Sequence, residues 1–448
     1  MDLGGGLFTD FYELTMAASY HAEGLDQPAT FDLFVRSLPP SRRFLVACGL
    51  EAALAHLERL RFDDGALAYL ASLERFDDDF LDRLRELRFT GDVWAVPEGV
   101  AVFDREPLLR VTGPLVEAQL VETALINLVA HQTGIASKAA RVALACGDHG
   151  FVDFSARRDH GPDAAQLGAR AAFVGGASGT SLVTAGQAFG LPVSGTMAHS
   201  FVMRFGSEAE AFRAFVRSFP DNATLLIDTF DTEDGARAVV EVAGELAEEG
   251  ISVQAVRLDS GELATLSRSV RAILDQGGLG EVRILASGDL DEHRIAALVG
   301  GGAPIDAFGV GTQMGTSADA PALGAVYKLV EDADGPKAKR SEGKATLPGR
   351  KQVWRVRDGD GRLDHDVLAL EDEEVAGGTP VLVPVMAGGS RLGPAPPLTE
   401  LRDRGRETLA SLPGELRRLD PRVGDDDYPV EVAPGLAALA EQVWGGRG

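Results

Sequence analysis

Residues 253–290 read VQAVRLDSGELATLSRSVRAILDQGGLGEVRILASGDL and contain one complete strand–helix–strand pattern. The apolar run VQAVRL occupies residues 253–258, and a second run, VRILA, occupies residues 282–286. The segment between them has helical periodicity and ends at a Gly-Gly pair, where glycine commonly terminates a helix. This order predicts a βα unit whose two strands pair in parallel.

The same pattern recurs on both sides of this stretch. Further strands are expected within residues 151–158, 191–196, 223–228 and 305–310. Helices are expected at residues 162–174, 180–189, 234–250 and 289–302. Such alternation indicates an α/β fold with a parallel sheet, either a barrel or a doubly wound sheet. Because polar residues and glycines gather where the strands end, as at the active-site rim of an α/β barrel, a barrel is favoured.

The rest of the chain has a different pattern. Before residue 116, short strand-like segments mix with helical segments at residues 49–60 and 64–87, and strand-like segments return after residue 324. We expect the late strands to pack on the N-terminal region, which makes that α+β domain discontinuous. The predicted boundaries are 1–115 for the N-terminal domain, 116–324 for the barrel, 325–420 for the returning strands and 421–448 for a C-terminal tail.

Composition and charge limit the class of protein. Of the 448 residues 45% are hydrophobic, and the formal net charge is −25 at pH 7. This negative charge argues against nucleic acid or an anionic membrane as a partner. No apolar run is as long as a membrane span, and the N-terminus lacks a signal-like pattern. With only two cysteines, Cys48 and Cys146, and no cysteine cluster for a metal, we expect a cytoplasmic protein.

Two glycine-rich segments follow the last two expected strands: ASGDLDEHR at residues 286–294 and GVGTQMGTS at residues 309–317. Glycine lets the backbone approach a ligand closely, and N–H groups at a helix start bind phosphate oxygens. Either segment alone is equally well explained as a tight turn, but loops after the last two strands of a barrel often form its phosphate site. Together they predict a phosphate site formed by these two loops.

The segment SGTMAHSF, residues 194–201, places His199 among small residues after a strand-like run. A neutral imidazole is nucleophilic and titrates near neutral pH, which suits the handling of a phosphoryl group. The alternative is a buried histidine whose ring nitrogens are satisfied within the core. The nearby phosphate loops favour the first interpretation.

The segment AVRLDSGEL, residues 255–263, places Arg257, Asp259 and Ser260 at another strand end. Side chains two residues apart in a strand point the same way, so Arg257 and Asp259 share one face. A cation beside a carboxylate suits a substrate phosphate and a ribose hydroxyl. The alternatives are an ion pair, and a helix cap formed by Asp259 or Ser260.

Aromatic residues lie near two further motifs. In VDFSARRDHGPDAA, residues 152–165, Phe154 precedes Arg157 and Arg158, which suits a flat ring bound beside an anion. The alternative is a core phenylalanine with a solvated arginine pair. In TDFYELTM, residues 9–16, Tyr12 lies in a capped helix start and reads as ordinary packing from its residue type alone.

The order of these motifs closely resembles that of nicotinate phosphoribosyltransferase. The likeness extends from about residue 9 to residue 355 and includes the segments GPLVEAQLVETALINLVAHQTGIASKAARV, GAVYKLV and LPGRKQVWR. It implies an irregular α/β barrel beside a discontinuous α+β N-terminal domain. It also implies that nicotinate reacts with 5-phosphoribosyl 1-diphosphate, giving nicotinate mononucleotide and diphosphate. ATP hydrolysis with Mg²⁺ would drive the reaction through a phosphohistidine at His199; no carboxylate cluster indicates the Mg²⁺ ligands.

The resemblance implies roles for the residues that contact the base. Tyr12 and Phe154 would stack on opposite faces of the pyridine ring, with Tyr12 supplied by the neighbouring subunit of a homodimer that shares its active sites. Thr196 and Arg257 would contact nicotinate, and Arg157 would hold substrate anions.

The resemblance assigns the ribose and the phosphates in the same way. Asp259 would bind the ribose hydroxyls beside Ser260. In the two glycine loops, Ser287, Gly288, Gly309, Gly311 and Thr312 would bind the 5-phosphate. Lys138, in HQTGIASKAAR, would help to bind phosphates.

Two positions bear on the choice of substrate. The related nicotinamide enzyme is similar but carries aspartate in a GTD motif, where this chain has GTS with Ser181. A carboxylate there would repel the carboxylate of nicotinate, whereas a hydroxyl donates a hydrogen bond, so Ser181 favours the acid. Ser155 replaces the glycine of the family pattern DFGxRR and is expected to crowd the ring-binding backbone. The alternatives are a phosphoribosyltransferase for nicotinamide or another small base, and a non-catalytic barrel that binds a phospho-ligand.

Overall fold

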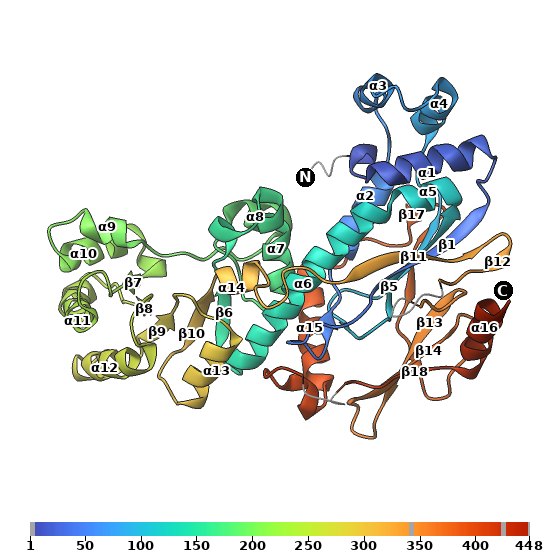
Figure 1. Cartoon of the computed structure of the whole chain (residues 1–448). Helices are drawn as coiled ribbons and strands as arrows, with labels where there is room; N and C mark the ends of the chain where they lie inside the picture. Colours follow the sequence, from blue (N-terminus) through green and yellow to red (C-terminus); the bar gives the residue numbers. More distant parts are fainter. Residues whose placement is uncertain (1–4, 340–344, 423–426, 447–448) are drawn as a thin grey trace. The chain divides into compact units, whose positions relative to one another are not determined.

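The structure is a computed structural model that describes residues 5–339, 345–422 and 427–446. The chain divides into two compact units. Unit 1 combines Met1–Ser137 with Ala320–Gly448, and unit 2 is Lys138–Asp319 (Figure 1). Within the described residues, none of the helices has both the length and the hydropathy needed to cross a membrane.

Unit 2 contains a five-stranded parallel sheet in the order β6–β10–β9–β8–β7. Its strands are β6 (Gly150–Asp153), β7 (Thr224–Leu226), β8 (Ala255–Leu258), β9 (Arg283–Ala286) and β10 (Ala307–Val310). Strands β7 to β10 all lie within the predicted apolar runs, and consecutive strands pair in parallel. The predicted α/β fold with a parallel sheet is confirmed.

Backbone pairing does not close this sheet into a barrel in the described residues. Thr180 forms isolated parallel bridges with the end of β6 and with Val193, which extend the sheet by two short steps. Between Val193 and β7 the described chain has no backbone pairing. One side-chain contact lies next to this gap, where the amide of Asn222 donates to the carbonyl oxygen of Gly195 at 3.1 Å.

The strand predicted at residues 191–196 is reduced to the single bridge at Val193, and this part of the prediction is wrong. The Pro192 carbonyl accepts the N–H of Thr180 at 3.0 Å, and the N–H of Ser194 donates to the Thr180 carbonyl at 2.9 Å. Both contacts lie on the side of Thr180, and among the described residues no backbone pairing joins the other edge of this segment to β7.

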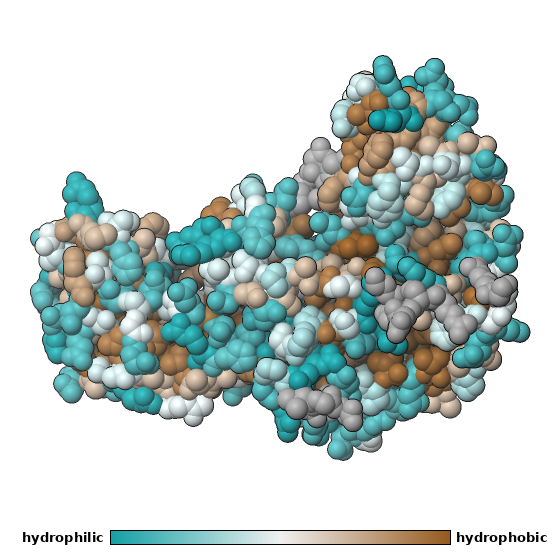
Figure 2. Space-filling view, in the orientation of Figure 1, coloured by the Kyte–Doolittle hydropathy of each residue, from teal (hydrophilic) through white to brown (hydrophobic). Residues whose placement is uncertain are grey.

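Helices flank the sheet of unit 2. They are α7 (Pro162–Val174), α8 (Val183–Phe189), α9 (His199–Met203), α10 (Glu208–Ser218), α11 (Thr232–Glu248), α12 (Leu263–Gln276), α13 (Glu292–Gly300) and α14 (Thr312–Gly315), with the short turns η2 (Ala156–Arg158) and η3 (Pro220–Asn222). On α11 the apolar residues Val239, Val242 and Leu246 recur at helical spacing and are buried. Helices α10, α11 and α12 lie in a row beside β7–β9, and hydrophilic residues are distributed over their surface (Figures 1 and 2).

Unit 1 contains a seven-stranded antiparallel sheet in the order β12–β11–β1–β5–β3–β16–β17. Its strands are β1 (Pro28–Val35), β3 (Asp92–Ala95), β5 (Pro107–Pro114), β11 (Ala325–Asp332), β12 (Gly335–Pro336), β16 (Val383–Ala387) and β17 (Ser390–Arg391). The late strands β11 and β16 pair with the early strands β1 and β3. Packing joins the same segments, because the rings of Phe31 and Tyr327 stack with centroids 4.8 Å apart.

A second sheet of unit 1 has the order β15–β13–β14–β18, and a small pair joins β2 to β4. These strands are β2 (Leu45–Val46), β4 (Ala101–Val102), β13 (Lys351–Arg357), β14 (Leu363–Leu370), β15 (Thr379–Pro380) and β18 (Val430–Val432). The helices are η1 (Gly5–Leu7), α1 (Phe11–Ala22), α2 (Leu50–Arg59), α3 (Asp64–Ser72), α4 (Asp78–Glu86), α5 (Leu115–Leu120), α6 (Glu122–Cys146), α15 (Leu398–Ser411), η4 (Gly414–Arg417) and α16 (Pro434–Gly445). Helix α6 contains the boundary between the two units.

The single helical segment expected at residues 64–87 forms two helices, α3 and α4. Glu74 adopts a positive φ of 52°, which interrupts the helical backbone. Asp77 then caps α4 by accepting the N–H of Phe80 at 2.9 Å. Periodicity alone did not reveal this break, because the apolar spacing continues across it.

A buried ion pair joins the two main sheets of unit 1. Lys351 Nζ, on β13, lies 2.9 Å from Oδ2 of Asp32, on β1. Burial raises the pKa of Asp32, and the charge of Lys351 opposes that shift. The ammonium group also donates to the carbonyl oxygens of Leu347 and Gly349, at 2.8 and 2.7 Å. The lysine is therefore fully bonded without water.

We predict that Lys351→Met destabilises unit 1 by about 3 kcal/mol, because it leaves Asp32 buried without its cation. Urea unfolding followed by circular dichroism measures the loss. Since Asp32 would take up a proton in this variant, the loss should shrink as the pH is lowered. The double variant Asp32→Leu/Lys351→Met is the control and should recover most of the stability; equal instability of both variants would contradict this account.

Candidate active site

The carboxyl edge of the parallel sheet in unit 2 gathers most of the predicted site residues. The first residue after each of the strands β6, β8, β9 and β10 is Phe154, Asp259, Ser287 and Gly311, respectively. Neighbouring parallel strands end at the same edge of a sheet, so these positions lie side by side. The two glycine loops and the Arg257 segment therefore share one edge.

His199 begins the short helix α9, and 38% of its side chain is exposed. Its Nδ1 lies 3.2 Å from the hydroxyl oxygen of Thr229, and its Nε2 lies 3.8 Å from Oδ2 of Asp259. The alternative of a histidine enclosed by the core is therefore wrong. A proton on Nδ1 that is donated to Thr229 leaves the lone pair on Nε2, the nitrogen that faces Asp259.

Asp259 connects His199 to the first glycine loop. Its Oδ1 accepts a hydrogen bond from the hydroxyl of Ser287 at 2.5 Å. Gly288 has a φ of +94°, and a Cβ at this position would overlap the carbonyl oxygen of Asp259. Only glycine satisfies both demands, so the close backbone approach expected at Gly288 is made to Asp259 within the chain.

Asp228 supports this arrangement, although the sequence analysis gave it no role. Its Oδ2 accepts the N–H of Asp259 at 2.8 Å and the hydroxyl of Ser260 at 2.7 Å. Its Oδ1 is buried and has no hydrogen-bond partner in the described part of the chain. The signal that identifies Asp228 is its place as the polar end of the apolar run ATLLID.

The predicted alternative of a helix cap at Asp259 or Ser260 is wrong. Helix α12 starts at Leu263, with Glu262 as its cap residue and no side-chain cap hydrogen bond. The Ser260 hydroxyl is instead bound to Asp228.

Arg257 extends from β8 and donates from Nη1 to the hydroxyl of Thr196 at 2.9 Å. Its Nε is buried without a hydrogen-bond partner in the described residues. Burial, with the nearby charge of Arg157, lowers the pKa of Arg257, while Asp259 and Asp228 raise it. No ion pair within 4.0 Å joins Arg257 to Asp259 among the described side chains, so the ion-pair alternative is not borne out.

Phe154 lies against the second glycine loop. A Cβ at Gly309 would lie 2.5 Å from Cδ2 and Cε2 of the ring, so Gly309 makes room for Phe154. The Phe154 N–H donates to the carbonyl oxygen of Val310 at 2.8 Å. The ring is half-buried rather than part of the core, and Arg157 and Arg158 are exposed. Their exposure agrees with a solvated pair as well as with anion binding.

Ser155 does not crowd the site in the way that was expected. Its side chain is buried, and its hydroxyl donates to Oδ1 of Asp153 at 2.6 Å. Gly315 supplies the space, because a Cβ there would overlap the Ser155 side chain. The serine is thus accommodated beneath the segment that carries Phe154.

Two smaller predicted residues border this edge. Ser181 is exposed, and its N–H donates to the carbonyl oxygen of Asp153 at 2.9 Å, which places it beside the end of β6. Thr312 is the first residue of α14, directly after Gly311.

Lys138 lies in a buried ionic cluster. Its Nζ is 2.6 Å from Oε2 of Glu292 and 3.0 Å from Oδ1 of Asp319, and Arg141 Nε is 2.9 Å from Oε1 of the same glutamate. Burial alone would raise the pKa of Glu292, but Lys138 and Arg141 outweigh it and lower that pKa. This arrangement gives Lys138 a structural task, and its role toward phosphates stays a prediction.

Tyr12 belongs to unit 1. It lies on α1 with 46% of its surface exposed, beside Phe11 with 50% exposed. Partial burial and the charges of Glu122 and Glu13 raise the pKa of Tyr12, so its hydroxyl keeps its proton. The Phe11 ring packs against Phe76, with centroids 5.8 Å apart. The predicted contribution of Tyr12 to a neighbouring subunit stays a prediction.

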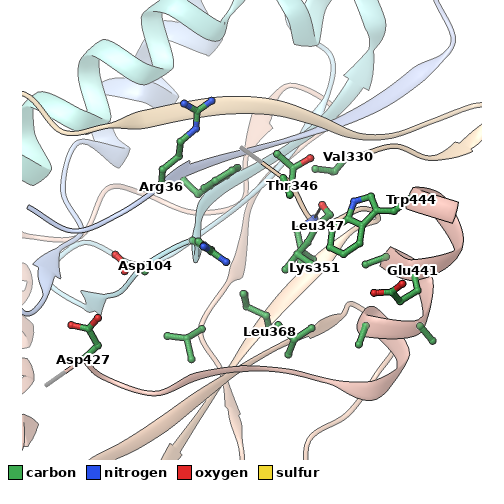
Figure 3. A pocket seen from close by; sticks show the side chains of 18 of the residues that line it. Arg36, Asp104, Val330, Thr346, Leu347, Lys351, Leu368, Asp427, Glu441 and Trp444 are labelled. Carbon is green, nitrogen blue, oxygen red and sulfur yellow. Dashed lines mark hydrogen bonds between the residues drawn. The ribbon is translucent and has the colours of Figure 1, made fainter. Parts of the chain in front are cut away.

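A cavity of about 890 Å³ also lies in unit 1. Trp444 extends from α16 toward Leu347 and Lys351, and Leu368 lines the cavity from β14 (Figure 3). None of the predicted site residues lines it. In the described parts of the chain, no group of three or more His, Cys, Asp or Glu side chains is arranged to hold a metal ion.

Two family models match successive segments of the chain. The model of the nicotinate phosphoribosyltransferase N-terminal domain matches residues 7–130, and the model of the nicotinate phosphoribosyltransferase family matches residues 149–333. A nicotinate phosphoribosyltransferase of Mycobacterium tuberculosis is 48% identical over 96% of this chain and 92% of its own length. The nicotinate phosphoribosyltransferase of Bacillus subtilis is 45% identical over 82% of this chain and 77% of its own.

Solved structures agree with these matches. The crystal structure of human nicotinic acid phosphoribosyltransferase has a TM-score of 0.86 and 30% identity, covering 97% of this chain and 99% of that chain. The matched region includes the strand-end residues His199, Arg257 and Asp259. The chain therefore belongs to the nicotinate phosphoribosyltransferase family.

Proposed function

We propose that the protein transfers the phosphoribosyl group of 5-phosphoribosyl 1-diphosphate to nicotinate, forming nicotinate mononucleotide and diphosphate, and that ATP hydrolysis drives this reaction. Family membership supports the activity. The observation that carries the proposal is the contact of His199 with Asp259, which is itself bonded to Ser287 of the first glycine loop. The direct test is formation of nicotinate mononucleotide by the purified protein, with and without ATP.

The nicotinate ring is proposed to lie on Phe154, with its carboxylate toward Arg257. A guanidinium stays charged despite the lowered pKa of Arg257, and charge-assisted hydrogen bonds to carboxylates are strong. The buried Nε of Arg257 has no hydrogen-bond partner among the described residues, so it has a donor to offer. Thr196 holds the other end of the same guanidinium at 2.9 Å, which supports its proposed role beside the base.

His199 is proposed to carry the phosphoryl group. The Thr229 hydroxyl, 3.2 Å from Nδ1, can accept a proton from Nδ1 and so suits the tautomer that leaves Nε2 unprotonated. Nε2 would attack the γ-phosphorus of ATP, forming an N–P bond as the bond to ADP breaks. Water would later cleave the N–P bond, releasing phosphate and restoring the imidazole. The 38% exposure of the His199 side chain is compatible with access of ATP.

The ribose and phosphates are proposed to lie along the two glycine loops. Asp259 would accept hydrogen bonds from ribose hydroxyls beside Ser260. Ser287, Gly288, Gly309, Gly311 and Thr312 would surround the 5-phosphate with a hydroxyl and backbone N–H groups. Arg157, which is exposed on η2, would hold the diphosphate or the carboxylate.

Two carboxylates at this edge have the chemistry to bind the Mg²⁺ ion that the proposed reaction requires. Mg²⁺ prefers oxygen ligands and commonly binds one or two carboxylates together with substrate phosphates. Asp228 Oδ1 is buried with no hydrogen-bond partner in the described chain, and the Asp259 side chain is 36% exposed. These two residues would hold the ion, whose charge would stabilise the departing diphosphate.

We propose an irregular barrel for unit 2, a homodimer and a cytoplasmic location. The cyclic order of the paired segments, interrupted only between Val193 and β7 in the described chain, supports the barrel. The exposed rings of Phe11 and Tyr12 support a subunit contact. Neither Cys48 nor Cys146 forms a disulfide in the described chain, as is usual in proteins of a reducing compartment.

His199→Ala should abolish ATP hydrolysis and the stimulation of the transfer by ATP, while slow product formation without ATP remains. The reason is that this variant lacks the imidazole nitrogen that is proposed to accept the phosphoryl group. Paired assays of ADP and of nicotinate mononucleotide measure both effects. Thr229→Val is the matched control and should retain part of the stimulation; full stimulation in His199→Ala would refute the phosphohistidine role.

Arg257→Ala should raise the KM for nicotinate about 10- to 100-fold, because a charge-assisted hydrogen bond to the carboxylate is lost. Steady-state kinetics with each substrate varied in turn give the result. Arg158→Ala, at an exposed position next to the proposed anion ligand, is the control for the loss of a positive charge. An unchanged KM in Arg257→Ala would count against its placement.

Ser181→Asp should raise the KM for nicotinate about tenfold, because the new carboxylate repels the carboxylate of nicotinate. The preference of the enzyme for nicotinate over nicotinamide should become smaller. The ratio of kcat/KM for the two bases is the measurement. Ser181→Ala removes only the hydroxyl and separates repulsion from loss of a donor. If Ser181→Asp keeps the original ratio, this position does not select the acid.

A further inference from the structure

Two carboxylates beneath the proposed base-binding segment share one hydroxyl. Ser155 Oγ lies 2.6 Å from Oδ1 of Asp153 and 3.0 Å from Oδ2 of Asp159. Ser155 and Asp153 are each 1% exposed, so the hydrogen bond between them is buried. We refer to Asp153, Ser155 and Asp159 as the Asp–Ser–Asp cluster.

The Ser155 hydroxyl has one proton but lies within hydrogen-bond distance of two carboxyl groups. Asp153 accepts the N–H of Ser155 at 3.0 Å and the hydroxyl of Thr180 at 2.8 Å, and Thr180 Oγ1 is itself the acceptor of the Leu182 N–H. Ser155 has a single hydroxyl proton, so it donates fully to only one carboxylate. The second close oxygen contact is attractive only when one of the two carboxyl groups is protonated.

The surroundings favour the proton on Asp159. Asp153 accepts three hydrogen bonds, from the N–H and hydroxyl of Ser155 and the hydroxyl of Thr180. By contrast, Oδ1 of Asp159 is buried with no hydrogen-bond partner in the described residues. Burial raises the pKa of both carboxyl groups. At Asp153 the hydrogen bonds from Ser155 and Thr180 oppose that shift, whereas at Asp159 the charge of Asp153 adds to it, against the hydrogen bond from Ser155 and the nearby His160. A protonated Asp159 would donate to Ser155, which in turn donates to Asp153.

Packed elements bring few other charges to Asp159. Helix α7 carries Asp163 and Arg170, and η2 carries Arg157 and Arg158. Helix α14 has no ionisable residue and contributes Gly315, where a Cβ would overlap both Asp159 and Ser155. The cluster is thus enclosed by small and neutral groups on the side of α14.

The cluster lies within the segment that carries Phe154 and Arg157. Ser155 follows Phe154 directly, and the carbonyl oxygen of Ser155 accepts the N–H of Arg158 at 2.8 Å to start η2. We propose that Ser155 and Asp159 are positioning residues for residues 154–158, and that they act by sharing one proton with Asp153. This inference rests on the proposed function for its kinetic consequence, but the shared proton itself does not.

The closing experiment compares the wild-type protein with Asp159→Asn from the ordinary titration range of a carboxyl group up to alkaline pH. Asparagine donates to Ser155 as a protonated acid does, but it cannot lose the proton. A group with a raised pKa in the folded protein loses its contribution as the pH rises through that pKa. The wild-type KM for nicotinate should therefore rise with pH, relative to Asp159→Asn, while kcat changes less.

Ser155→Ala is the second variant, because it removes the bridge and keeps both carboxyl groups. It should raise the KM for nicotinate about tenfold at every pH, as expected for loss of a buried hydrogen bond. Gly315→Ala should act in the same direction by forcing the cluster apart. Superimposable pH profiles of KM for wild type and Asp159→Asn would overturn the shared proton.

Thermal unfolding gives a readout that does not need catalysis. The Tm of the wild type should fall relative to that of Asp159→Asn as the pH is raised, and a constant difference would also overturn the inference. A wild-type protein that does not turn over nicotinate would instead refute the proposed function, and the Tm comparison would still decide whether the proton is shared. Failure of Asp159→Asn to fold would show that this position needs the ionised acid and would reject the proposal.

Discussion

The common direction of the parallel strands in unit 2 is the constraint on which the rest of the site depends. Strands that run the same way and pair with each other end at one edge, so the first residues after them become neighbours. The backbone contact at Gly288 depends on the same arrangement, because the carbonyl oxygen of Asp259 takes the place that a Cβ would need. Reversing any one of these strands would move its polar residue to the opposite edge.

Electrostatics at this edge differ from those of the whole chain. The protein carries a formal charge of −25, yet the proposed substrates are anions. The acidic side chains at the edge are held by donors, with Asp228 bound to an N–H and a hydroxyl and Asp259 bound to Ser287. Arg257, by contrast, is bonded to a neutral hydroxyl and keeps its charge available. A local balance of this kind allows anion binding in a strongly acidic protein, because nearby groups outweigh distant, screened charges.

The elements that were predictable have strong local signals. The apolar runs that became β7 to β10 are short and bounded by turn residues, and each contains the observed strand. The strand predicted at residues 191–196 is reduced to one bridge because only its Thr180 side has a backbone partner, and the edge toward β7 stays unpaired in the described chain. The helix at residues 64–87 failed because the break at Glu74 leaves the apolar spacing unchanged. Asp228 was missed because a single polar residue at the end of an apolar run is an ordinary feature of strands, and only its contacts distinguish it.

The sequence by itself determined the α/β class, the order of the motifs and the residue types at the strand ends, since these follow from short-range patterns of polarity and glycine. The tertiary structure alone decided which groups meet. It placed Nε2 of His199 at 3.8 Å from Oδ2 of Asp259, which is 60 positions away in the sequence. It also paired Lys138 with Glu292 and placed Gly315 against Ser155. These contacts join residues from different helices and loops, and their partners depend on how the elements pack in space. Local sequence carries no record of that pairing.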